Sequence, residues 1–142
     1  MDFQKIARYQ MKLAQLMRDH KQFYNCLILC DRALFSMAKA IYVHRNQIIP
    51  SSFSLSMNDL LRLIHTDAEP SLDKVLFIGT VHYLVSGEDD ASKEPMKLEE
   101  VDMLLYKTDH ILKRLSQRIV ADPSKRYPSI FKEKSFNRII VD

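Results

Sequence analysis

Glycine is scarce in this sequence, and its scarcity narrows the fold. Gly79 and Gly87 are the only two among 142 residues. Folds made of many hairpins need glycine where φ is positive, and loops that cradle a phosphate need it for close backbone approach. Apolar residues nevertheless make up 46% of the chain, which is enough for a folded core. We therefore expect one mainly helical domain.

Long apolar runs, a strong charge imbalance and a cysteine framework are missing as well. No run approaches the roughly 20 apolar residues of a membrane span, and the opening "MDFQKIARYQ" lacks the apolar stretch of a signal peptide. The net charge of +3, from 21 Lys and Arg against 18 Asp and Glu, is too small to indicate nucleic acid by itself. Two cysteines do not make a secreted disulfide framework. A cytoplasmic protein without a membrane segment is the expectation.

Three segments carry apolar residues at helical spacing. Residues 3–20 and 98–120 each have one apolar arc and one polar arc, which predicts amphipathic helices. The second of these begins with acidic residues and has basic residues near its end, as the helix dipole favours. Residues 21–45 are apolar most of the way round, which predicts the central helix of a bundle.

Two further segments are harder to assign. The stretch "KVLFIGTVHYLV", residues 74–85, has the composition of a buried strand, but no partner strand is recognisable, so helix is preferred. Ser56 is placed to cap a short helix. That helix would carry the apolar side chains of Leu60, Leu61, Leu63 and Ile64.

The chain is expected to divide into a helical bundle over residues 1–121 and a C-terminal extension over 122–142. The extension mixes aromatic and basic residues without a sustained helical period. It either packs across the bundle or extends to a partner. A mixture of cations and aromatics also suits contact with RNA, although basic tails are often only solvated.

Cys26 and Cys30 lie on one face of the central helix. An i,i+4 pair holds its Cβ atoms about 5–6 Å apart, which is wider than a disulfide prefers. A closed zinc site needs about four ligands, and the sequence has no second paired motif. Both cysteines are therefore predicted to be small core residues, and no metal or other cofactor is expected.

Asp31 is the one charge on the apolar side of the central helix, on the same face as Tyr42. A buried carboxylate needs a donor or a cation, or it takes up a proton. One interpretation is a structural hydrogen bond to Tyr, Arg or His of another helix. The other is a polar binding pocket inside the bundle, with Asp31 and Tyr42 as candidate binding residues.

The last predicted helix carries a second stripe outside its core face. Met103, Tyr106, His110 and Arg114 follow one another at helical spacing. An aromatic, a histidine and a methionine on an outer face are typical of an interface, and a plain exposed face is the alternative. We take Tyr106, His110 and Arg114 as candidate binding residues, in a dimer or against a partner.

The segment "CDRALFSMAKAIYVHRNQIIP" resembles the central helix of HEPN domains, the higher-eukaryote and prokaryote nucleotide-binding family. The later stretches "NDLLRLI" and "KLEEVDMLLYKTDHIL" are similar to the short helix and the last helix of that family. The resemblance spans about residues 15–120. The positions that match the central helix are Asp31, Arg32, Ala33, Phe35, Ser36, Lys39, Ala40 and Ile41.

The resemblance implies a four- or five-helix up-and-down bundle, often a homodimer and often beside a nucleotidyltransferase. Some members are ribonucleases with Arg, four to six residues and then His. Arg62 and His65 are too close for that motif, and His110 precedes Arg114 and Arg118. A non-catalytic binding domain is therefore preferred. A divergent ribonuclease or RNA-binding module using His110 with Arg114 or Arg118 is the alternative, and nucleotide binding is a third.

Overall fold

The computed structural model describes residues 2–47, 72–86 and 96–131, together with residues 56, 58, 59 and 62. Its longer described segments form four α-helices and one short 3-10 helix. They are α1 (Phe3–Asp19), α2 (Phe23–Asn46), α4 (Leu72–Ser86), α5 (Leu98–Ile119) and η2 (Pro123–Lys125). No strand occurs in these segments, so the all-helical prediction holds for them, and residues 74–85 are helical as preferred.

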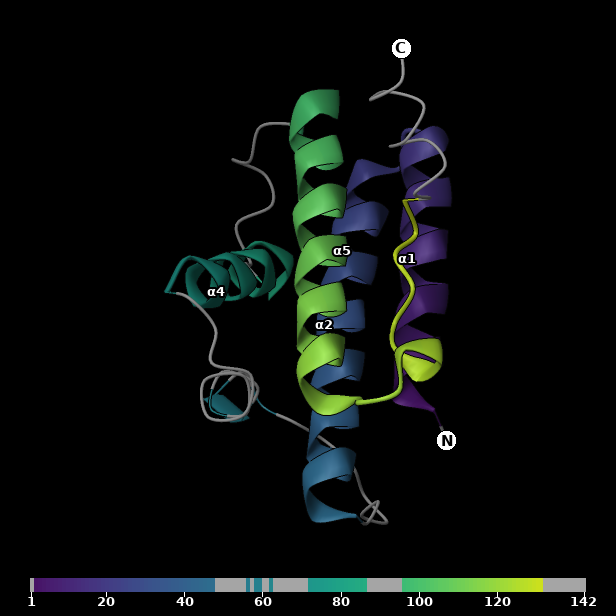
Figure 1. Ribbon diagram of the computed structural model, residues 1–142. Helices are drawn as coiled ribbons and strands as arrows, with labels where there is room; N and C mark the ends of the chain where they lie inside the picture. The colour runs from purple at the N-terminus through teal and green to yellow at the C-terminus, as the bar shows by residue number, and fades with distance from the viewer. Residues whose placement is uncertain are drawn as a thin grey trace.

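Three helices, α1, α2 and α5, lie side by side along most of their length (Figure 1). The end of α1 lies beside the start of α5, where Arg18 contacts Asp102, and the start of α1 lies beside the end of α5, where Gln4 contacts Ser116. Helix α1 is therefore antiparallel to α5. Helix α2 is also antiparallel to α1, so α2 and α5 run in the same direction.

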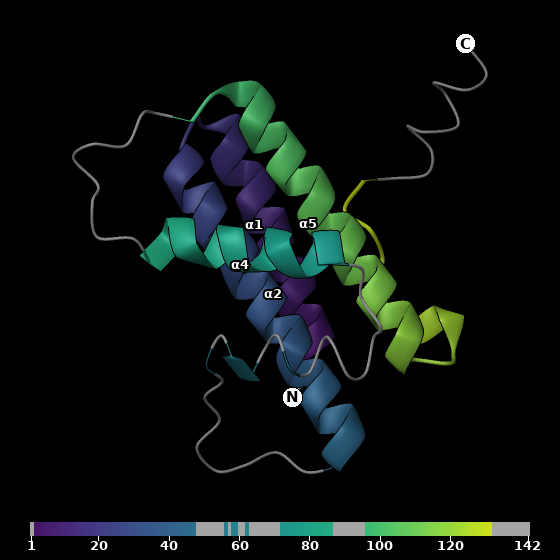
Figure 2. The ribbon, with the colours of Figure 1, turned by 90° about the vertical axis from the view of Figure 1, so that its left-hand side faces the viewer.

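Helix α4 departs from the expected up-and-down arrangement, because it runs across the other three (Figure 2). Ile78 and Val81 are buried, whereas Leu76 and Tyr83 are more than half exposed. The apolar residues of α4 surround the helix instead of forming one stripe along it. Crossing the bundle therefore buries the side that faces α2 and leaves apolar side chains on the other side exposed.

The core forms mainly where α1 packs on α2, and the two cysteines belong to it. Cys26 and Cys30 are both buried free thiols, which confirms their assignment as core residues. Small side chains on both helices let the backbones approach closely. The fully buried core residues on these two helices are Ala7, Met11, Ala14, Cys26, Cys30, Ala33, Leu34, Met37, Ala38 and Ile41.

Side-chain caps fix several helix starts. Asp2 Oδ1 accepts hydrogen bonds from the backbone N–H groups of Gln4 (3.0 Å) and Lys5 (3.2 Å) at the start of α1. Ser56 Oγ accepts one from Asp59 N (3.2 Å), while Asp59 Oδ2 accepts one from Ser56 N (3.2 Å). This reciprocal pair is a capping box, so Ser56 caps a helical turn as predicted. The leucines and isoleucine expected in that helix lie outside the described residues.

Residues 120–131 turn back and pack along the bundle instead of leaving it (Figure 1). Tyr127 and Ile130 are buried in the core, at 3% and 9% exposure. Of the two alternatives for the C-terminal extension, packing across the bundle therefore applies as far as Phe131. Residues 132–142 lie outside the described part of the chain.

Among the residues described, no helix has the length and apolar character needed to span a bilayer.

Candidate functional site on helix α5

The five candidate binding residues lie in three separate places. Asp31 is buried between α2 and α4, while Tyr106, His110 and Arg114 are exposed on the outer side of α5. Tyr42 is partly buried on α2. It shares a helical face with Asp31, but the rise of 1.5 Å per residue places it about 16 Å further along the axis. Asp31 and Tyr42 therefore do not form one compact pocket.

Asp31 has a partner on another helix, as the structural interpretation requires. Nδ1 of His82, on α4, lies 3.2 Å from Oδ1 and 3.3 Å from Oδ2 of the carboxylate. The His82 ring also packs on Phe35 of α2, with centroids 5.3 Å apart. The sequence pointed to a histidine only as one of three residue types. His82 itself was missed because it lies on α4. The apolar residues of that helix do not follow one stripe, so the sequence does not indicate which of its faces packs on α2.

Burial and the histidine act on Asp31 in opposite directions. Burial raises the pKa of the Asp31 carboxyl above its ordinary value, and His82 lowers it by a smaller amount. The net result is a raised pKa. The ionised carboxylate of Asp31 is therefore less stable in the folded chain than in water, because the contact with His82 offsets only part of its desolvation.

The outer stripe of α5 consists of Met103, Tyr106, His110 and Arg114, and all four are exposed. Met103 is 55% exposed and Tyr106 is 60% exposed, which is unusual for such large apolar groups. The rings of Tyr106 and His110 stack with centroids 6.5 Å apart and planes within 8°. The stripe is thus one continuous surface, and the stacking of Tyr106 on His110 holds these two rings in a defined arrangement.

Phe131 extends this surface beyond α5. Its ring lies 5.9 Å from that of Tyr106, and it remains 38% exposed. A hollow of about 300 Å³ opens beside the two rings and is also lined by Leu105, Arg18 and Asp102. The contribution of Phe131 could not be seen in the sequence, since it depends on the chain turning back after α5.

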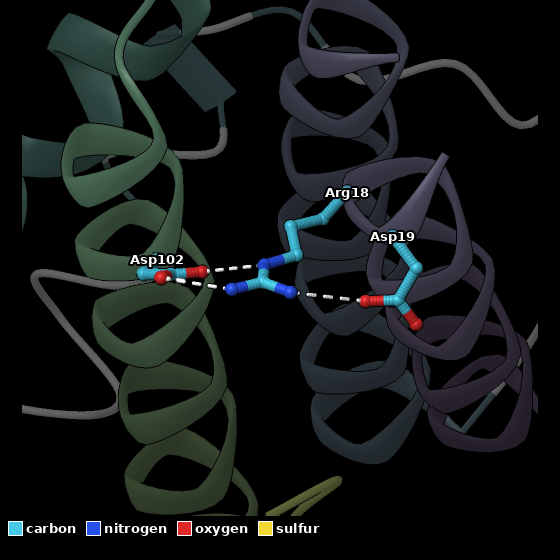
Figure 3. Close-up of polar contacts among 3 residues, drawn as sticks. All are labelled: Arg18, Asp19 and Asp102. Carbon is cyan, nitrogen blue, oxygen red and sulfur yellow. Dashed lines mark hydrogen bonds and ion pairs between the residues drawn. The ribbon is translucent and has the colours of Figure 1, made fainter. Parts of the chain in front are cut away.

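Arg18 and Asp102 close one side of the hollow with an ion pair between α1 and α5 (Figure 3). Arg18 Nε donates to Asp102 Oδ1 (2.7 Å) and Nη2 to Oδ2 (3.1 Å), while Nη1 reaches Asp19 Oδ1 at 3.2 Å. The guanidinium lowers the pKa of the Asp102 carboxyl. With two carboxylates against one cation, this edge of the surface carries no excess positive charge.

Asp109 is a buried carboxylate that the sequence analysis missed. It is 3% exposed and accepts hydrogen bonds from Tyr127 Oη (2.6 Å), from Ile130 N (3.0 Å) and from the hydroxyl of Ser129. Burial raises the pKa of the Tyr127 hydroxyl, and the neighbouring Asp109 raises it further. These bonds hold residues 127–130 against α5 and thereby position Phe131. The sequence did contain an indication of its burial, because Asp109 lies at the edge of the apolar arc of the helix predicted over residues 98–120.

Among the described residues, no group of three or more His, Cys, Asp and Glu side chains is placed so that it could hold a metal ion. The Cys30 thiol lowers the pKa of Cys26, while contact with Cys26 and burial raise that of Cys30. Both thiols are buried, so they are poorly accessible to solvent oxidants.

Comparison of the chain with protein-family models and with curated proteins gives no match in either case.

Proposed function

We propose that the chain is a non-catalytic, HEPN-like interaction domain that forms a homodimer through the outer stripe of α5. The exposed, ordered set of Met103, Tyr106, His110 and Phe131 carries this proposal. Tyrosine, methionine, phenylalanine and arginine are enriched at the cores of protein interfaces. An interface of this kind would remove from water the apolar side chains that the monomer leaves exposed.

Charge along α5 favours a second copy of the chain as the occupant. Glu99 and Glu100 lie in its first turn, whereas Lys113 and Arg114 lie near its end. Two copies of α5 packed antiparallel about a two-fold axis near Tyr106 would bring Glu99 opposite the partner's Arg114. The same axis would bring Met103 opposite the partner's His110. Such a contact is self-complementary in charge and in apolar character, as a closed dimer requires.

The test is the mass in solution, measured by light scattering on a sizing column over a range of protein concentrations. Tyr106→Ala with His110→Glu should convert a dimer into a monomer, because it removes the aromatic stack and places carboxylates near the axis. Tyr9→Ala with Lys12→Gln is the control with the same change in net charge, since both residues are exposed on the outer side of α1. A wild-type monomer at every concentration contradicts the homodimer.

A charge swap sharpens the same test. Arg114→Glu alone should weaken the dimer, because Glu99 would then face a like charge. Glu99→Arg combined with Arg114→Glu should restore it. If the double variant is as monomeric as the single one, Glu99 and Arg114 do not face each other.

The resemblance also suggests a nucleotidyltransferase as a partner, and a ribonuclease is the second candidate. His110 and Arg114 are exposed and one turn apart, which is the observation that favours the second candidate. The side chain of Arg118 lies outside the described residues. Incubation of wild type and His110→Ala with RNA separates the two functions, since cleavage that His110→Ala abolishes would establish the ribonuclease.

A further inference from the structure

A hollow of about 660 Å³ lies at the opposite end of the seam between α1 and α5 from Arg18, between the start of α1 and residues 120–128. Four of its lining residues are basic: Lys5, Arg8, Lys125 and Arg126. Asp2 is its one acidic lining residue. With four cations against one carboxylate, the lining of the hollow carries an excess of positive charge as large as the +3 of the whole chain.

The nearby carboxylates are already engaged. Asp2 Oδ1 accepts hydrogen bonds from two backbone N–H groups of α1. Asp122 accepts from both the backbone N–H (3.0 Å) and the hydroxyl (2.9 Å) of Ser124. Within the described ranges, none of the four cations forms an ion pair with a carboxylate. The Ser124 hydrogen bonds lower the pKa of the Asp122 carboxyl most, and the charge of Arg126 adds a smaller effect, so Arg126 is partly compensated. The charges of Lys5, Arg8 and Lys125 remain available to a ligand, in contrast to that of Arg18.

Backbone carbonyls hold the two guanidinium groups in position without neutralising them. Arg8 Nε donates to Pro128 O (3.2 Å), and Arg126 donates to Val120 O (2.7 Å) and to Ala121 O (3.1 Å). Neither Nη atom of Arg8 takes part in these bonds. Lys5 and Lys125 are exposed at the rim, where their ammonium groups can move towards a ligand. Fixed arginines and mobile lysines together suit an anion with several acceptor oxygens.

We propose that this hollow binds the phosphate group of a phosphorylated ligand. An apolar ligand is a poor match for four cations, whereas a phosphate accepts several charge-assisted hydrogen bonds at once. The volume is within the roughly 300–1,000 Å³ of small-molecule sites, so a mononucleotide fits it as well as one phosphate of an RNA strand. The site is separate from the outer stripe of α5, and the proposal does not depend on the dimer.

Calorimetric titration with inorganic phosphate, ATP and a short oligouridylate tests the proposal. Lys5→Gln with Lys125→Gln removes two cations that have no structural hydrogen bond to lose. Lys12→Gln with Lys97→Gln, also exposed, is the control with the same change in net charge. We expect the first pair to weaken binding about tenfold or more and the control to change it far less. Melting temperatures of both variants establish that the fold is intact.

The three ligands distinguish the source of the phosphate. Binding of ATP or phosphate that the Lys5/Lys125 pair weakens identifies a free phosphorylated ligand. Binding of the oligouridylate alone, weakened by the same pair, identifies RNA. Either result supports the site. No binding of any of the three at millimolar concentration, or an equal loss in the control variant, overturns it.

Discussion

Two aspartates on α5, seven residues apart, connect that helix to different parts of the chain in opposite ways. Asp102 is exposed and forms a bidentate ion pair with Arg18 of α1. Asp109 is buried and accepts three hydrogen bonds, none of them from a cation, from residues 127–130. Both carboxylates have well-formed partners, so the difference between them is access to water.

That difference in access to water decides how much each contact contributes to the free energy of unfolding. Water replaces a lost partner at Asp102, so its ion pair adds little to the free energy of unfolding. Water does not easily replace a lost acceptor at Asp109, and the donors around it would remain unsatisfied. Asp31 is a third case, since it is buried but has His82 as the partner that the described contacts identify. Substitutions at the three sites should therefore differ strongly in cost.

The largest effect is expected from Asp109→Ala. It leaves the hydroxyls of Tyr127 and Ser129 and the backbone N–H of Ile130 without their acceptor. The loss should be about 3 kcal/mol or more in the free energy of unfolding, measured by urea denaturation. Asp109→Asn is the matched control. It keeps the oxygen that Tyr127 and Ile130 use, and its amide can donate to Ser129, so it should cost much less.

Equal losses in the Asn and Ala variants would show that the charge of Asp109, and not its hydrogen bonds, holds residues 127–130. A loss below about 1 kcal/mol in Asp109→Ala would show that apolar burial of Tyr127 and Ile130 is sufficient. Either outcome would remove the contrast with Asp102.

An intermediate and pH-dependent effect is expected from His82→Phe. Phenylalanine keeps the ring against Phe35 but removes the contact that lowers the pKa of the Asp31 carboxyl most, so that the smaller effect of Arg32 remains. The loss should be about 1–3 kcal/mol at neutral pH. A carboxyl whose pKa is raised on folding stabilises the fold fully below its unfolded pKa, near 4, and this contribution is lost as pH rises through the folded pKa. The deficit should therefore shrink towards pH 4.

Asp31→Asn in the His82→Phe background is the control for that effect. The amide carries no charge, so the double variant should lose most of the pH dependence between pH 4 and 7 and recover part of the stability. Denaturation curves at several pH values measure both. A deficit in His82→Phe that does not change with pH would mean that the ionisation of Asp31 is not involved.

The sequence was sufficient to predict the helices and their buried faces, because these depend on the spacing of apolar residues. It was not sufficient to predict how the chain runs between and after the helices. Apolar spacing predicted α1, α2 and α5, and the wheel correctly put Asp31 and the cysteines inside. Helix α4 was preferred only because a strand over residues 74–85 would have had no recognisable partner. The sequence could not predict that α4 crosses the bundle, because a helix that is apolar all round has no preferred direction. Asp109 and Phe131 were missed for a related reason, since their roles depend on how the chain turns after Ile119.

The smallest effect is expected from Arg18→Gln, although its ion pair with Asp102 is bidentate. Asp102 is exposed and the Arg18 side chain is 33% exposed, so water and salt compensate for the lost attraction. The loss in melting temperature should be several times smaller than for Asp109→Ala, and it should vanish at about 1 M ionic strength. Arg18→Lys keeps the charge but not the bidentate contact, and should lie between wild type and Arg18→Gln. A large loss that persists in high salt would mean that this end of the seam is held by packing of the Arg18 stem, and exposure would then no longer explain the difference between Asp102 and Asp109.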